Sequence, residues 1–85
     1  MSQTKGTEAM TQIRENIWQV TYDDLGHPPA RGYYQVEGLG EVLIDQADLH
    51  YINETHAKGY EPVFHVSRSK ALNNAFVVVG RQQKA

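Results

Sequence analysis

One stretch of this 85-residue chain carries the signals of an α-helix, and that helix limits what the chain can fold into. Asp45 is a suitable N-cap and Gly59 is a suitable residue to end a helix, so the sequence predicts a helix from Gln46 to Lys58. Its apolar stripe is narrow and has three members: Leu49, Ile52 and His56. A helix with so narrow a stripe is unstable alone and needs a sheet to lie on.

The segments on both sides of this helix have the composition and the alternation of β-strands. Strands are expected over residues 17–22, 33–37, 41–44, 63–66 and 74–79. The order β-β-β-α-β-β predicts the α+β class, with a small antiparallel sheet of four to five strands and one helix packed on one face.

Alternation along the strands assigns their side chains to two faces of the sheet. The apolar face is expected to hold Trp18, Val20, Tyr22, Tyr34 and Val36. The other face is expected to show polar residues and two rings to solvent: Gln19, Thr21, Gln35, Glu37, Tyr33 and His65. The run from Phe76 to Val79 is apolar at every position, so the last strand is expected to be central in the sheet or covered on both faces.

Both ends of the chain are polar and lack the period of a helix or strand. Residues 1–12 are expected to be a disordered tail, residues 13–81 a single α+β domain, and residues 82–85 a frayed tail. This length suits one domain. The sequence has no apolar run of the kind found in secretory signals or membrane spans, so the expected location is the cytoplasm, with no membrane partner.

The composition excludes several classes of chemistry. The chain has no cysteine, which rules out thiol catalysis, thiolate metal sites and disulfide bonds. It has 8 Lys and Arg against 10 Asp and Glu, with a net charge of −2, so long-range attraction to nucleic acid is not expected. A core of this size is only marginally stable without disulfide bonds or a bound metal. A partner subunit is another way to add stability.

The remaining polar residues do not form a catalytic or ligand-binding motif. His50 and His56 are six residues apart on the helix, which places them on different faces, so they cannot chelate one ion together. The segment from Gly38 to Gly40 joins two strands and is expected to be a turn. Asp23 and Asp24 are expected to be solvated turn formers. The sequence therefore predicts no catalytic residue, no metal and no cofactor.

The longest irregular connection runs from Asp23 to Gly32 and contains Pro28 and Pro29. We expect this loop to be exposed, to be mobile and to lie near any binding site, and we expect its shortening to leave the fold intact. Tyrosine and arginine are enriched at interfaces. The candidate interaction residues lie on this loop, on the strand after it and before the last strand: Asp24, His27, Arg31, Tyr33, Tyr34, Arg68 and Lys70.

Three functions are compatible with these residues. The leading hypothesis is a non-enzymatic interaction module that binds a second copy of itself or another protein, because one narrow helix cannot cover the aromatic residues of the expected sheet. The first alternative is a nucleic-acid-binding sheet that uses Arg31, Tyr33, Arg68 and Lys70. The second alternative is a small enzyme that uses the acids and the histidine of the 23–32 loop.

Overall fold

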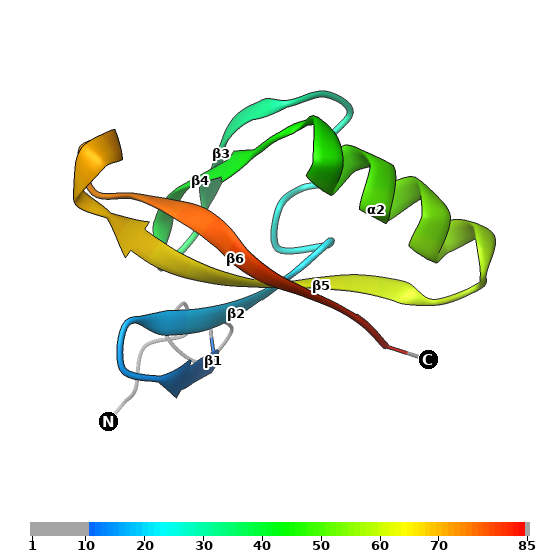
Figure 1. Cartoon of the computed structure of the whole chain (residues 1–85), viewed down its shortest axis with the longest axis horizontal. Helices are drawn as coiled ribbons and strands as arrows, with labels where there is room; N and C mark the ends of the chain where they lie inside the picture. The colour runs from blue at the N-terminus through cyan, green and yellow to red at the C-terminus, as the bar shows by residue number, and fades with distance from the viewer. Residues whose placement is uncertain (1–10, 85) are drawn as a thin grey trace.

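The computed structural model describes residues 11–84, which form a six-stranded sheet with an α-helix packed on it (Figure 1). In chain order the elements are β1 (Thr11–Arg14), β2 (Ile17–Thr21), β3 (Gly32–Val36), β4 (Gly40–Ile44), α2 (Gln46–Ala57), β5 (Glu61–Ser69), the 3-10 turn η1 (Lys70–Leu72) and β6 (Ala75–Lys84). The predicted α+β class is confirmed. The described sheet has six strands and not four to five, because the short segment β1 also pairs.

The strands lie in the order β1-β2-β5-β6-β4-β3, so β5 and β6 occupy the middle of the sheet (Figure 1). Neighbouring strands are antiparallel except β4 and β6, which are parallel. A parallel pair needs a long connection, which α2 and β5 provide here. The β5–β6 hairpin turns at Asn73 and Asn74, whose φ angles of 57° and 68° suit asparagine better than most residues.

Both ends of the described chain extend the sheet further than the alternation of side chains suggests. A disordered tail was predicted over residues 1–12, but residues 11 and 12 belong to strand β1. The rest of this predicted tail, residues 1–10, lies outside the described part of the chain. β6 continues to Lys84, opposite Glu61, and so enters the segment over 82–85 that was predicted to fray. The side chains there are exposed and polar, and pairing with β5 through the backbone makes this segment a strand.

The core lies between the sheet and the layer formed by α2 and the 22–31 connection. Phe64 and Phe76, in the two central strands, are fully buried, and each contributes about 1.5–3 kcal/mol through burial. The core cluster consists of Val20, Leu25, Val36, Val42, Ile44, Ile52, Phe64, Val66 and Phe76. Half-buried rings pack around it, including Trp18, Tyr34 and Tyr51.

The connection between β2 and β3 contributes to this core, which contradicts the expectation of a loop exposed along its whole length. Leu25 is only 3% exposed and belongs to the core cluster, and Pro28 is also buried. The backbone N–H of Leu25 bonds to the carbonyls of Thr21 and Tyr22, which closes a tight turn directly after β2. The apolar side chain of Leu25 is held inward by this turn. Shortening the loop is therefore expected to remove part of the core.

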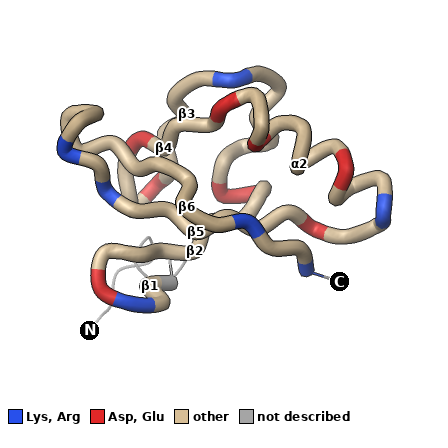
Figure 2. Tube along the Cα trace, viewed as in Figure 1, with Lys and Arg blue, Asp and Glu red and all other residues tan. Residues whose placement is uncertain are grey.

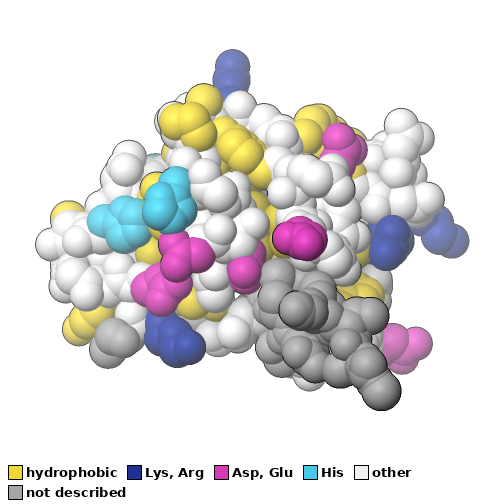
Figure 3. Space-filling model, turned by 180° about the vertical axis from the view of Figure 1, so that it is seen from behind, with side chains coloured by type: hydrophobic (Ala, Val, Ile, Leu, Met, Phe, Trp, Pro, Cys, Tyr) yellow, Lys and Arg dark blue, Asp and Glu magenta, His cyan; other side chains and the backbone are white. Residues whose placement is uncertain are grey.

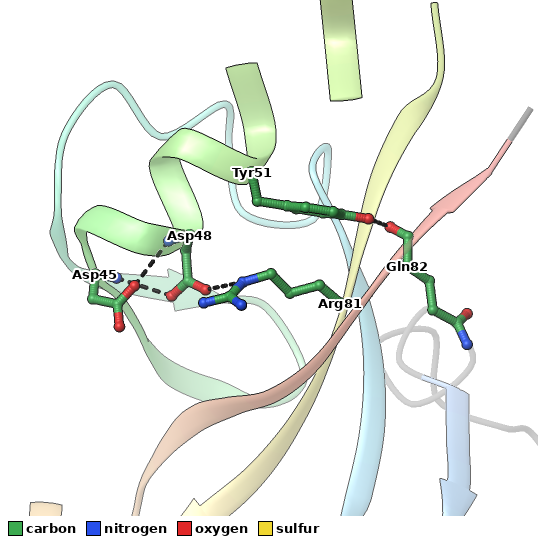
Figure 4. Close-up of polar contacts among 5 residues, drawn as sticks. All are labelled: Asp45, Asp48, Tyr51, Arg81 and Gln82. Carbon is green, nitrogen blue, oxygen red and sulfur yellow. Dashed lines mark hydrogen bonds and ion pairs between the residues drawn. The ribbon is translucent and has the colours of Figure 1, made fainter. Parts of the chain in front are cut away.

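The N-terminal part of α2 is attached to β6 by polar contacts, in which Asp48 is the buried group (Figure 4). Asp45 is the N-cap, as predicted, and forms a capping box with Asp48. Asp48 is 1% exposed and binds Arg81 of β6, with 2.8 Å between Oδ1 and Nε. The hydroxyl of Tyr51 donates to the backbone carbonyl of Gln82. These contacts fix α2 against the polar end of the last strand.

The side of α2 that faces the sheet differs from the predicted stripe. Its buried residues are Asp48, Ile52 and Thr55, whereas Leu49 is half-buried and His56 is exposed. Two of the three buried residues are polar, so hydrophobicity alone identifies only Ile52. Burial raises the pKa of Asp48, and the Arg81 guanidinium partly offsets this effect.

The helix bounds agree with the sequence prediction. α2 ends at Ala57 with Lys58 as its C-cap, and Gly59 follows with a φ of +81°. Within residues 11–84, no helix is long and apolar enough to cross a membrane.

Candidate functional site

A row of apolar side chains crosses three strands on the sheet face opposite α2. Tyr33 of β3 pairs with Leu43 of β4, and Leu43 pairs with Val77 of β6. Their chain neighbours Tyr34, Val42 and Phe76 pack into the core, so the row points to the other face. We call this row the outer-face row. It ends at Tyr33, on the last strand of the sheet, and Tyr33 is 51% exposed.

The outer-face row was only partly expected from the sequence. Tyr33 was assigned to this face, but the apolar run from Phe76 to Val79 suggested a strand that is central or covered on both sides. β6 is central, yet Val77 is only half-buried and Val79 is 56% exposed. Val79 has no partner in the β5–β6 register, which shifts between His65 and Val66. This irregularity depends on the pairing of two strands and has no local signal in the sequence.

The free edge of β3 lies at the end of the outer-face row. Among the described residues β3 pairs only with β4, residue for residue from Gly32 opposite Ile44 to Val36 opposite Gly40. Its outward backbone groups therefore have no strand partner in the described chain. An edge of this kind is a template for pairing with another chain.

A second feature is an open, shallow pocket of about 440 Å³ where β2 enters the connection to β3. The ring of Tyr22 stacks on His27 at 4.6 Å and meets His56 edge to face at 4.7 Å. Nε2 of His27 lies 2.6 Å from Oδ1 of Asp23. Figure 3 shows histidine side chains next to acidic side chains on this side of the molecule. The lining of the pocket includes Tyr22, Asp23, His27, His56, Tyr60 and Glu61.

The pocket contains acid–base groups, but they lie open to water. The side chains of His27 and Asp23 are 63% and 75% exposed, so solvent screens their interaction. His27 has a φ of +57°, an uncommon conformation for a residue other than glycine. In the described part of the chain, no group of three or more His, Asp or Glu side chains is arranged to hold a metal ion. The geometry provides a surface recess and does not enclose a substrate.

The predicted loop residues have separate roles in the structure. Asp24 closes the turn after β2: its carboxylate accepts the N–H of Thr21 at 2.9 Å, and its own N–H donates to the Thr21 hydroxyl at 3.2 Å. Tyr34 packs on the core side, and its hydroxyl donates to the carbonyl of Ala30. Of the candidate interaction residues, only His27 lines the pocket, together with Asp23 of the same loop.

The predicted basic residues do not gather at one place. Arg68 lies over the ring of Phe76, with its guanidinium carbon 4.7 Å from the ring centroid, and Lys70 lies in η1. Arg68 lies seven positions along β5 from Glu61 at the pocket end of the strand, which corresponds to about 23 Å of extended chain. Arg31 is exposed directly before β3, at an edge of the sheet.

Basic and acidic residues are spread along the described chain, and Figure 2 shows them interspersed without a continuous basic stripe. Binding to nucleic acid depends mainly on clustered positive charge that neutralises phosphates. The structure therefore adds no observation that favours the nucleic-acid hypothesis.

The fold and these surfaces define a small α+β domain with an open recess and, within residues 11–84, a sheet edge that has no strand partner. Comparison with known protein families, curated proteins and solved structures found no match to this chain. A functional proposal for it therefore depends on its own surfaces.

Proposed function

We propose that this protein is a non-enzymatic interaction module that self-associates as a homodimer. The observation that carries the proposal is the outer-face row, which ends in the exposed ring of Tyr33 at the free edge of β3. A tyrosine ring provides a large contact area at low conformational cost, and such rings are enriched at interfaces. A second copy is the partner that adds stability to so small a core.

The structure changes the reason for this proposal. The sequence suggested that the aromatic residues of the sheet would outnumber what one helix can cover. In the structure Phe64 and Phe76 are fully buried, because Leu25 from the 22–31 connection covers the sheet together with α2. The apolar surface available for a partner is therefore on the opposite face and at the β3 edge, where Tyr33 lies.

The chain also lacks cysteine, which is compatible with a reducing compartment, and we place the dimer in the cytoplasm on that basis. A homodimer is the simplest closed assembly for one chain, because each copy presents the same patch to the other.

The test is the mass of the full chain in solution. Sedimentation equilibrium or light scattering at micromolar concentration is expected to give twice the chain mass of 9.6 kDa. Tyr33→Lys is expected to shift the protein toward the monomer, because it places a charge at the centre of the contact. The matched control is Ala57→Lys at the exposed end of α2, which adds the same charge away from β3. A wild-type protein that stays monomeric at all concentrations contradicts the proposal.

A further inference from the structure

The two edges of the sheet differ in their ability to pair with another strand. β1 has four residues, carries Arg14 and is interrupted by a register shift between Gln12 and Arg14. Charges and bulges are the features that protect natural edge strands from pairing. β3 has no charged residue or proline between Gly32 and Val36, and it pairs with β4 without irregularity. β3 is therefore the edge that a further strand can join.

The residues that flank β3 define where such pairing can occur. Pro29 and the proline before it lack N–H groups, which limits a backbone ladder on that side. On the other side the chain turns after Val36, where the N–H of Leu39 bonds to the carbonyl of Val36. The stretch that remains is β3 itself, from Gly32 to Val36, with Tyr34 in the middle and Arg31 and Glu37 flanking its two ends.

The charges of this stretch are complementary to those of a second copy. Arg31 and Glu37 are both exposed, and each is three residues from Tyr34. In an antiparallel pair centred on Tyr34, Arg31 lies opposite Glu37 of the partner subunit, and the two-fold axis repeats the contact. Opposite charges across an antiparallel pair are stabilising, whereas like charges are destabilising. If the register shifts by two residues, neither of the two Arg31–Glu37 contacts forms.

The geometry points to a homodimer in which β3 pairs with β3 of a second copy, antiparallel and centred on Tyr34, so that the two six-stranded sheets become continuous. This inference rests on the proposed self-association and names its surface. Tyr33 then lies opposite Gln35 of the partner subunit and diagonally next to Tyr33 of the partner subunit, within reach of an aromatic ring. The outer-face rows of the two copies meet at the two-fold axis.

The first experiment reverses the charge of Arg31 or of Glu37 in separate variants. The dissociation constant of the dimer is measured for each variant by sedimentation equilibrium at low salt. Arg31→Glu alone places Glu opposite Glu, and Glu37→Arg alone places Arg opposite Arg. Each single variant is expected to dimerise at least about tenfold more weakly than the wild type, because two attractive contacts become repulsive. An equimolar mixture of the two variants is expected to form a heterodimer of nearly wild-type affinity, since each Glu then faces an Arg.

Matched controls make the same charge changes at the C-terminal end of α2, with Glu54→Arg in its last turn and Lys58→Glu at its C-cap, where both residues are exposed. Neither control is expected to change the dissociation constant by more than about twofold. Circular dichroism of every variant verifies that the fold is retained.

A second experiment uses the absence of native cysteine, which makes an introduced thiol unique in the chain. Tyr33→Cys mixed with Gln35→Cys is expected to form a disulfide-linked heterodimer under mild oxidation, because these positions are opposite each other in the proposed register. Tyr33→Cys mixed with Ala57→Cys is the control and is expected to remain largely uncrosslinked.

The outcomes separate the two proposals. A wild-type monomer overturns both of them. A wild-type dimer whose affinity is unchanged by Arg31→Glu and by Glu37→Arg, and that does not crosslink between positions 33 and 35, overturns β3 pairing and leaves self-association standing. Weakening in both single variants with recovery in their mixture supports the β3 dimer.

Discussion

The guanidinium Nε of Arg81 lies 2.8 Å from Oδ1 of Asp48, which joins the polar end of β6 to the first turn of α2. The two side chains differ in exposure, at 2% for Asp48 and 37% for Arg81. Asp48 also accepts the backbone N–H of Asp45 at 3.0 Å, so its carboxylate is satisfied from two elements. This contact explains how a helix with few apolar residues stays attached to the sheet.

Removal of the guanidinium is expected to destabilise the fold. Arg81→Met leaves the buried carboxylate of Asp48 with fewer partners, and the expected loss is about 1–3 kcal/mol in the free energy of unfolding. Urea denaturation measures the loss. Lys58→Met is the control, because it removes an exposed cation from the end of α2 without a buried partner. Equal stability of the two variants would show that the Arg81 contact contributes nothing beyond surface charge.

The N-cap of α2 gives a pH-dependent prediction. Oδ1 of Asp45 accepts the N–H of Asp48 at 2.8 Å, and this hydrogen bond lowers the pKa of Asp45. Asp45→Ala is expected to cost about 1 kcal/mol at neutral pH. Because the folded pKa lies below the ordinary value of 3.8, this contribution is fully present above 3.8 and is lost as the pH falls through the folded value.

The measurement for this prediction is the stability difference between the wild type and Asp45→Ala as a function of pH. The difference is expected to shrink on acidification below 3.8. Asp45→Asn is the control, since its amide oxygen still caps the helix but does not titrate in this range. A difference that stays constant from neutral to strongly acid solution is incompatible with the cap hydrogen bond as the cause.

The 22–31 connection gives a prediction about the core. Leu25→Ala is expected to lower the free energy of unfolding by about 2–4 kcal/mol, because it leaves a cavity beneath the loop. Pro29→Ala in the same loop is expected to change it by less than about 1 kcal/mol, since Pro29 is exposed. Thermal and chemical unfolding compare the two variants. If both have the same small effect, the loop does not contribute to the core.

The adjacent acids of this connection are expected to differ in their contribution to stability. Asp24→Ala removes the acceptor of the Thr21 N–H and is expected to cost about 1 kcal/mol. Asp23→Ala removes only the exposed contact with His27 and is expected to change stability by less than about 0.5 kcal/mol. Denaturant titration measures the free energy of unfolding of both variants. If Asp23→Ala loses more stability than Asp24→Ala, the contact between Asp23 and His27 has the structural role that we assign to Asp24.

The helix was predictable from the sequence because its signals are local. Asp45 caps the first turn and Gly59 adopts the positive φ that follows the last one, so both ends are marked by residues next to them. The strands after Asn16 were predictable for a similar reason, since each of them contains β-branched or aromatic residues in its own short segment. From these elements follow the α+β class and the placement of a helix on a sheet.

Other features of the fold depend on contacts between residues far apart in the chain, and only the tertiary structure decides them. The polar end of β6 is a strand because β5 lies beside it, and Asp48 is buried because Arg81 is across from it. Leu25 became a core residue because the connection packs on the sheet beside α2, and Tyr33 lies at an edge of the described sheet because β3 is last in the strand order. Strand order and register are set by contacts between residues far apart in the chain, so no local period in the sequence specifies them.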